Sequence, residues 1–91
     1  MDLNKLIKDP IFFKIVKFFS ENPASIDTPR GIATWIGEDK PVTKNMLDKL
    51  VDLKILTAHK VSSTTGYSYT DDRELIRKID STLKKMEKSR A

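Results

Sequence analysis

The chain has 91 residues, of which 38% are hydrophobic and 33% are charged, and its formal net charge is +4. This length accommodates one domain, residues 1–91, rather than two. The sequence has no cysteine and one histidine, which excludes disulfides, thiolate nucleophiles and a histidine metal cluster within one chain. No apolar run reaches the about 20 residues that cross a bilayer, and the N-terminus lacks the layout of a signal peptide, so we expect a cytoplasmic protein without a membrane partner.

The basic excess lies in the last third of the chain. Residues 59–91 include eight basic and five acidic side chains, a net charge of +3, whereas residues 22–58 include five of each. A basic balance favours polyanionic partners such as nucleic acid. The middle of the chain, however, brings no net charge to such a partner.

A first long helix is predicted to begin at Pro10. Asp9 followed by proline is typical of an N-cap and a first helical position. Residues 11–19 are apolar on nearly all sides, which predicts a central core helix, and Pro23 ends it. We expect its aromatic residues in the core, with one of them available for an interface: Phe12, Phe13, Phe18 and Phe19. Residues 1–8 form a short arm or a first helical turn, with apolar residues at helical spacing: Leu3, Leu6 and Ile7.

Two more helices follow, joined by a sharp turn. Thr28 and Pro29 repeat the start signal, and Gly37 is placed to end the second helix. We expect Trp35 of this helix to pack in the core or against a neighbouring helix, with the alternative of a ligand platform less favoured. Asp39 is expected to cap the third helix, whose inward stripe is Thr43, Leu47, Leu50 and Leu53.

The sequence then changes to an extended pattern, which a last helix follows. Residues 55–61 and 67–70 alternate around a polar loop, 62–66, that contains Gly66, which predicts a hairpin. Asp71 and Asp72 then stand at the start of a C-terminal helix, residues 71–88. Its apolar residues step by three, four and three, the pattern of a heptad seam, and we expect them to form the interface of a homodimer because little of the chain is left to cover them: Ile76, Ile79, Leu83 and Met86.

The chain resembles the winged helix-turn-helix family of the MarR/ArsR kind. The residues that carry the resemblance are Ile32-Ala33 with Ile36-Gly37, Leu47 and Leu50 with Lys54-Ile55-Leu56, and Tyr67-Ser68-Tyr69-Thr70. Lys54 stands where glycine is usual in the family. The resemblance implies an α+β, mostly α-helical fold, with a three-helix core, a two-stranded wing and a C-terminal dimerisation helix.

The resemblance also implies double-stranded DNA as partner, with the third helix in the major groove and the hairpin on the backbone. Asn45 then pairs with adenine, Val42 touches a thymine methyl group, and Asp48 is expected to pair locally instead. Basic and hydroxyl side chains provide the remaining predicted contacts: Arg30, Lys40, Lys44, Lys49, Lys60, Ser63 and Thr64.

Two functions stay open at this stage. One is a small dimeric transcriptional regulator with sequence-specific DNA binding. The other is a winged-helix protein–protein interaction module without direct DNA readout. No nucleophile–base pair and no glycine-rich phosphate loop is found, so we expect no enzyme, no cofactor, no metal and no evident small-molecule ligand.

Overall fold

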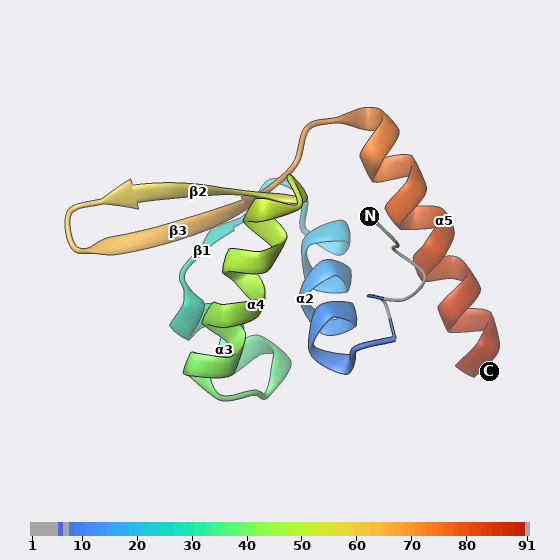
Figure 1. Cartoon of the computed structure of the whole chain (residues 1–91), viewed down its shortest axis with the longest axis horizontal. Helices are drawn as coiled ribbons and strands as arrows, with labels where there is room; N and C mark the ends of the chain where they lie inside the picture. Colours follow the sequence, from blue (N-terminus) through green and yellow to red (C-terminus); the bar gives the residue numbers. More distant parts are fainter. Residues whose placement is uncertain (1–5, 7, 91) are drawn as a thin grey trace.

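The computed structural model describes residue 6 and residues 8–90, with side chains as far as residue 87 (Figure 1). The elements in chain order are α2 (Pro10–Glu21), β1 (Ile26–Asp27), α3 (Pro29–Ile36), α4 (Lys40–Asp52), β2 (Leu56–Val61), β3 (Thr64–Tyr69) and α5 (Arg73–Arg90). Most of the predicted N-terminal arm, residues 1–5 and 7, lies outside the described residues, and Leu6 packs against the core. No helix in the described part of the chain is long and apolar enough to cross a bilayer.

Local signals in the sequence set the helix ends. The carboxylate of Asp9 accepts a hydrogen bond from the Ile11 amide at 2.9 Å, and the Thr28 hydroxyl accepts one from the Gly31 amide at 3.2 Å. Each bond satisfies a first-turn amide that has no partner within its helix. Gly37 ends α3 at a φ of 71°, in the left-handed region. Asp39 precedes α4 as predicted, but its side chain makes no capping hydrogen bond.

The core surrounds α2, as its apolar sequence predicts. Phe12, Ile15 and Phe19 are fully buried, and Leu47 and Leu50 of α4 are fully buried with them. Each such side chain contributes roughly 1.5–3 kcal/mol relative to an exposed position. This burial orients α4, because the same contacts leave its other side facing outward.

The sheet is antiparallel with the strand order β1-β3-β2. The predicted hairpin is confirmed, but its turn is tighter than expected: Val61 pairs with Thr64, and Ser62 adopts a φ of 54°. Gly66 lies within β3 opposite His59, so its assignment to the loop was wrong. The physical reason is the tight turn, which lets pairing begin at Thr64. Glycine suits the position because β1 approaches closely: a Cβ at Gly66 would lie 2.9 Å from Cγ2 of Ile26.

These elements form a winged helix-turn-helix with a mostly α-helical α+β architecture. The helix-turn-helix is α3 and α4, the wing is the β2–β3 hairpin, and β1 adds a third strand to the predicted two. The hairpin extends from one end of the molecule and α5 lies at the other end (Figure 1). Both α4 and the wing therefore leave a common outer side of the fold open to a partner.

The seam of α5 packs on the chain's own core. Ile79 and Leu83 are only 1% and 5% exposed, and Ile76 and Met86 are partly buried against the same cluster. The expectation that little of the chain covers these residues was wrong, because α5 folds back along α2 and Lys17 of α2 forms an ion pair with Glu87 at 3.1 Å. The homodimer stays a prediction. Its interface on α5 would consist of the side chains that are not buried against the chain's own core.

Candidate nucleic-acid interface

A hollow of about 380 Å³ lies where the starts of α3 and α4 meet the tip of the hairpin. It brings together five of the residues that the sequence predicted for DNA binding, which are Arg30, Lys40, Lys44, Ser63 and Thr64. Thr28, Pro29 and Thr65 complete the lining, and no acidic side chain belongs to it. Three cations and several hydroxyl groups thus converge from three separate segments.

Arg30 and Lys40 are exposed and form no ion pair with any residue that the structure describes. Arg30 is the second residue of α3 and Lys40 the first of α4, and backbone amides in the first turn of a helix carry a partial positive charge. An anion such as a phosphate is favoured in such a place by the side-chain cations and by the helix ends together. The hollow therefore has the electrostatics of a phosphate contact.

Lys44 is held differently from the other two cations. Its Nζ lies 2.8 Å from Oδ2 of Asp48, while the Tyr67 hydroxyl donates to Oδ1 of the same carboxylate at 2.8 Å. The hydrogen bond from Lys44 lowers the pKa of Asp48, and burial together with the bond to Asp48 raises the pKa of Tyr67 to about 12. Asp48 thus pairs locally, as the sequence predicts, and ties β3 of the wing to α4.

The other flank of α4 carries the remaining predicted contacts of this helix. Val42, Asn45 and Lys49 border a second hollow of about 330 Å³, together with Asp9, Ile11 and Met46. At 3.6 residues per turn, Asn45 lies opposite the buried stripe of Leu47 and Leu50. The predicted contact residues of α4 are therefore all on its outer side, but they divide between its two flanks.

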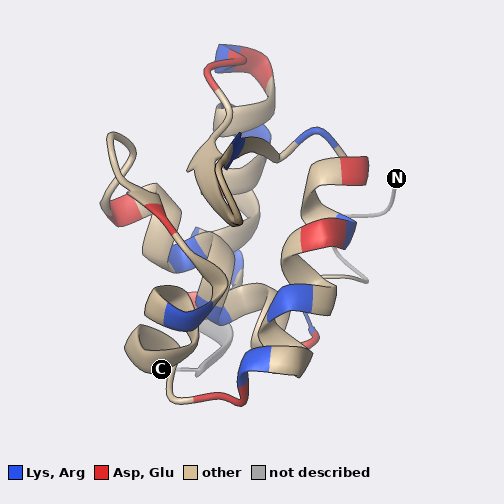
Figure 2. Ribbon diagram, turned by 90° about the vertical axis from the view of Figure 1, so that its left-hand side faces the viewer, with Lys and Arg blue, Asp and Glu red and all other residues tan. Residues whose placement is uncertain are grey.

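Lys60 lies apart from both hollows. It is exposed on β2, where it pairs in register with Thr65. Lys and Arg are interspersed with Asp and Glu over the ribbon on the side of the hairpin (Figure 2). The surface on this side is thus mixed in charge. The hollow beside the wing differs from it, because no Asp or Glu lines that hollow.

Tyr67 and Thr65 also contribute to this region, and neither contribution is evident from the sequence. A strand pattern shows that Tyr67 points inward, but not that its hydroxyl reaches α4 across the core edge. The sequence predicts Thr65 in the loop, but Thr65 belongs to β3 and lines the same hollow as Arg30 and Lys44. Both contacts join segments that are distant in the sequence, so no local sequence pattern predicts them.

The sequence matches no protein-family model and no curated protein. Among solved structures, the fold is similar to the AntR antimony-specific transcriptional repressor, with a TM-score of 0.73 and 17% identity over 94% of this chain and 75% of that one. It is also similar to a mutant of Staphylococcus aureus MepR bound to an oligodeoxyribonucleotide, with a TM-score of 0.67 and 14% identity over 94% of this chain and 68% of that one.

One similar structure is an enzyme. Human N-acetylserotonin methyltransferase matches with a TM-score of 0.57 and 17% identity over 75% of this chain, but over 21% of the enzyme. At these identities the likenesses show the fold, a winged helix-turn-helix, and not an activity. Most of the similar structures are regulators, and the enzyme resembles this chain in one part of its length.

Proposed function

We propose that this chain binds double-stranded DNA as a small cytoplasmic transcriptional regulator. The observation that carries the proposal is the acid-free hollow between α3, α4 and the wing, lined by Arg30, Lys40 and Lys44. A phosphate of the DNA backbone fits this hollow in charge and in hydrogen-bonding groups. The fold of a DNA-bound MepR mutant adds support, because the same arrangement of helices is compatible with a duplex.

Sequence readout belongs to the outermost residues of α4. Asn45 has the amide that pairs with adenine N6 and N7, Val42 is an apolar neighbour for a thymine methyl group, and Lys49 adds a donor for guanine or phosphate. Asp48 is engaged by Lys44 and Tyr67, so it fixes the position of the Lys44 ammonium beside the hollow. Lys60, Ser63 and Thr64 place the wing on the backbone.

A homodimer is part of the proposal, because two recognition helices reach successive major grooves about 34 Å apart. With Ile79 and Leu83 buried in the single chain, Ile76 and Met86 are the seam residues that keep partial exposure for a second copy. Truncation of α5 would uncover the core, so the oligomeric state has to be measured by sedimentation of the full chain. A monomer at high concentration would reduce the proposal to one half-site.

The test is fluorescence anisotropy of a labelled random duplex at about 50 and about 200 mM salt. Two phosphate contacts per chain, from the cations of the hollow that form no ion pair, give a slope of about −1.8 for log K against log salt, which is roughly a 12-fold loss of affinity over this range. A bound pair of chains gives about twice that slope. Absence of salt-dependent binding would overturn the proposal.

Specificity is tested by selection from a random duplex library. Asn45→Ala is expected to relax the preference at one base pair by about 1–3 kcal/mol, while Asp52→Ala, also on an exposed side of α4, leaves the preference unchanged. Identical selected sequences from the wild type and the Asn45 variant would show that the readout is assigned to the wrong residue.

A further inference from the structure

A groove of about 610 Å³ lies between α2, β1 and α3, and it shares no lining residue with the two hollows beside α4. The indole of Trp35 packs on the half-buried ring of Phe18 in this groove, with 5.9 Å between the ring centroids. Trp35 is nevertheless 71% exposed, and Ile26 at the edge of the sheet is 65% exposed. Of the two placements expected for Trp35, packing against a neighbouring helix is confirmed and packing in the core is not, since only one side of the indole is covered.

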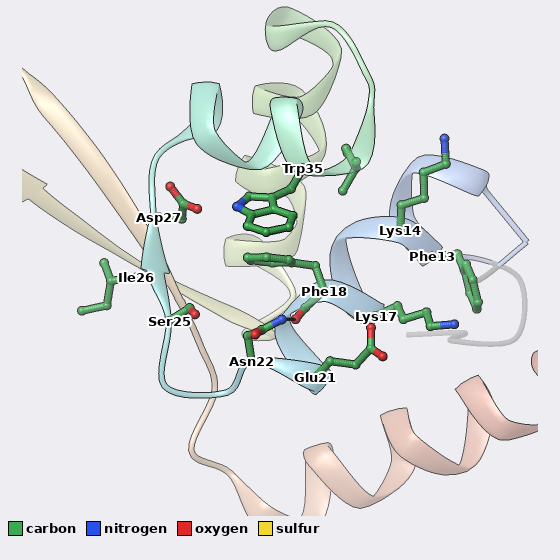
Figure 3. Close-up of a pocket in the computed structure, with 11 residues that line it drawn as sticks. Phe13, Lys14, Lys17, Phe18, Glu21, Asn22, Ser25, Ile26, Asp27 and Trp35 are labelled. Atoms are coloured by element: carbon green, nitrogen blue, oxygen red, sulfur yellow. Dashed lines mark hydrogen bonds between the residues drawn. The ribbon is translucent and has the colours of Figure 1, made fainter.

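The lysines of the groove already have partners. Lys14 lies 2.7 Å from Glu38, and Lys17 lies 3.1 Å from Glu87, as ion pairs that lead outward from the groove. In the close-up, both ammonium groups point away from the stacked rings of Trp35 and Phe18 (Figure 3). The positive charge of these two residues is thus compensated and directed elsewhere.

The two carboxylates of the groove have no cationic side chain as partner in the described part of the chain. Glu21 and Asp27 form no ion pair with any residue in the described part of the chain, and Asp27 accepts one backbone hydrogen bond, from the amide of Thr28 at 2.8 Å. Asp27 lies beside the indole, on the side to which the indole nitrogen points, and Glu21 lies on the side of Phe18 (Figure 3). Two unpaired acids thus flank the aromatic pair, although the chain as a whole is basic.

This combination matches the chemistry of an arginine side chain. A guanidinium group stacks on an indole face, pairs with carboxylates and is weakly hydrated, so it is the cation that suits a half-apolar surface. The groove also has apolar side chains in its lining, Phe18, Ile26 and Ile36, against which aliphatic residues next to that arginine can pack. Nucleic acid does not fit, because these carboxylates form no ion pair and repel phosphate.

We propose that the groove formed by Phe18, Trp35, Glu21 and Asp27 docks a partner protein through an arginine flanked by aliphatic side chains. The proposal is independent of DNA binding, since the groove and the α4 surface have no residue in common. The groove is thus a second contact surface of the fold. It allows a partner protein to bind at the groove while a duplex is bound at α4.

The only tryptophan of the chain, Trp35, reports on this surface directly. The probe is a capped peptide in which leucine and arginine alternate, and its control replaces each arginine by citrulline, which has the same shape without the charge. We expect a saturable blue shift of the tryptophan emission of the full chain, with the citrulline peptide bound at least about fivefold more weakly. Equal binding of both peptides, or no saturable shift, would overturn the proposal.

Variants separate the groove from the rest of the surface. Glu21→Gln is expected to weaken peptide binding by about two- to fivefold, while Asp52→Asn, an exposed acid on α4, leaves it unchanged. Trp35→Ala, followed by calorimetry because the fluorophore is lost, is expected to abolish most of the binding. Equal loss of peptide binding in the Glu21 and Asp52 variants would overturn the proposal, because it would indicate general charge attraction. A shift of the emission that depends on protein concentration alone would also overturn it, since the groove would then bind a second copy of the chain.

Discussion

Replacement of Tyr67 by phenylalanine removes the hydroxyl that joins the wing to α4. Tyr69, two residues further along the same strand, offers a matched control, because it is also buried but its hydroxyl has no hydrogen-bond partner among the described residues. The two substitutions delete the same atom from the same element. We therefore expect them to change the free energy of unfolding in opposite directions.

The magnitudes follow from the partners of the two hydroxyls. A hydrogen bond to a charged group contributes about 1.5–3 kcal/mol. The Asp48 side chain is 52% exposed, so water replaces part of the lost bond and we expect Tyr67→Phe to destabilise by about 1 kcal/mol. Burying a hydroxyl without a partner is unfavourable, so Tyr69→Phe is expected to stabilise by about 0.5–1 kcal/mol.

Urea denaturation at constant m-value measures both effects. The expected difference between the variants, about 2 kcal/mol, corresponds to roughly 10 °C in Tm for a domain of this size. Equal effects of the two substitutions, or a larger destabilisation by Tyr69→Phe, would refute the assignment of the Tyr67–Asp48 contact.

Three further predictions concern two residues with positive φ on either side of α4 and one carboxylate within it. Lys54→Gly is expected to stabilise by about 0.5–1 kcal/mol in urea, because Lys54 adopts a φ of 67°; no gain would contradict this. Gly37→Ala is expected to destabilise by about 1 kcal/mol, since Gly37 has a φ of 71°, and an unchanged denaturation midpoint would oppose that reasoning. Asp48→Asn is expected to flatten the acid side of the stability profile: the hydrogen bond from Lys44 lowers the pKa of Asp48, so its stabilisation is present above the ordinary value of 3.8 and is lost as the pH falls through the lowered pKa. Parallel profiles of the wild type and this variant in acid would contradict the sign.

Much of the fold is predictable because its signals are local. Asp9 and Thr28, each before a proline, start α2 and α3, and Gly37 ends α3 with the positive φ that a glycine allows. The apolar stripe of α4 assigns Leu47 and Leu50 to the core, and therefore Asn45 to the outside. Lys54 has a φ of 67°, in the region that favours glycine, so this position requires a conformation that the residue itself does not signal.

What the sequence could not predict depends on contacts between distant segments. Gly66 is in a strand because the hairpin turns earlier, at Ser62, whose φ is 54°, and Gly66 pairs with His59. The side chain of Ile26 packs over it and leaves no room for a Cβ. Trp35 has a helical position typical of packing, yet α2 covers only one of its faces. Leu83 is covered because α5 turns back onto the core after the wing. The residue pattern within α5 does not predict the direction in which this helix runs.

The candidate site shows the same division. Periodicity identifies which residues of α4 face outward, but not that Arg30, Lys44 and Thr64 meet in one hollow, because they belong to three elements. Local pairing of Asp48 was predicted, and the structure gives Lys44, one helix turn away, as its partner. The hydroxyl of Tyr67 that completes it comes from the wing and was not.

The most direct test of the central claim is the salt dependence of duplex binding in two variants that lose one positive charge each. Arg30→Ala removes a cation from the hollow beside the wing, and Lys78→Ala removes an exposed cation from α5. We expect the slope of log K against log salt to fall by about 1 per chain for Arg30→Ala and to stay at the wild-type value for Lys78→Ala. Equal slopes in both variants, or a smaller slope for Lys78→Ala alone, would contradict the claim that this hollow holds the DNA backbone.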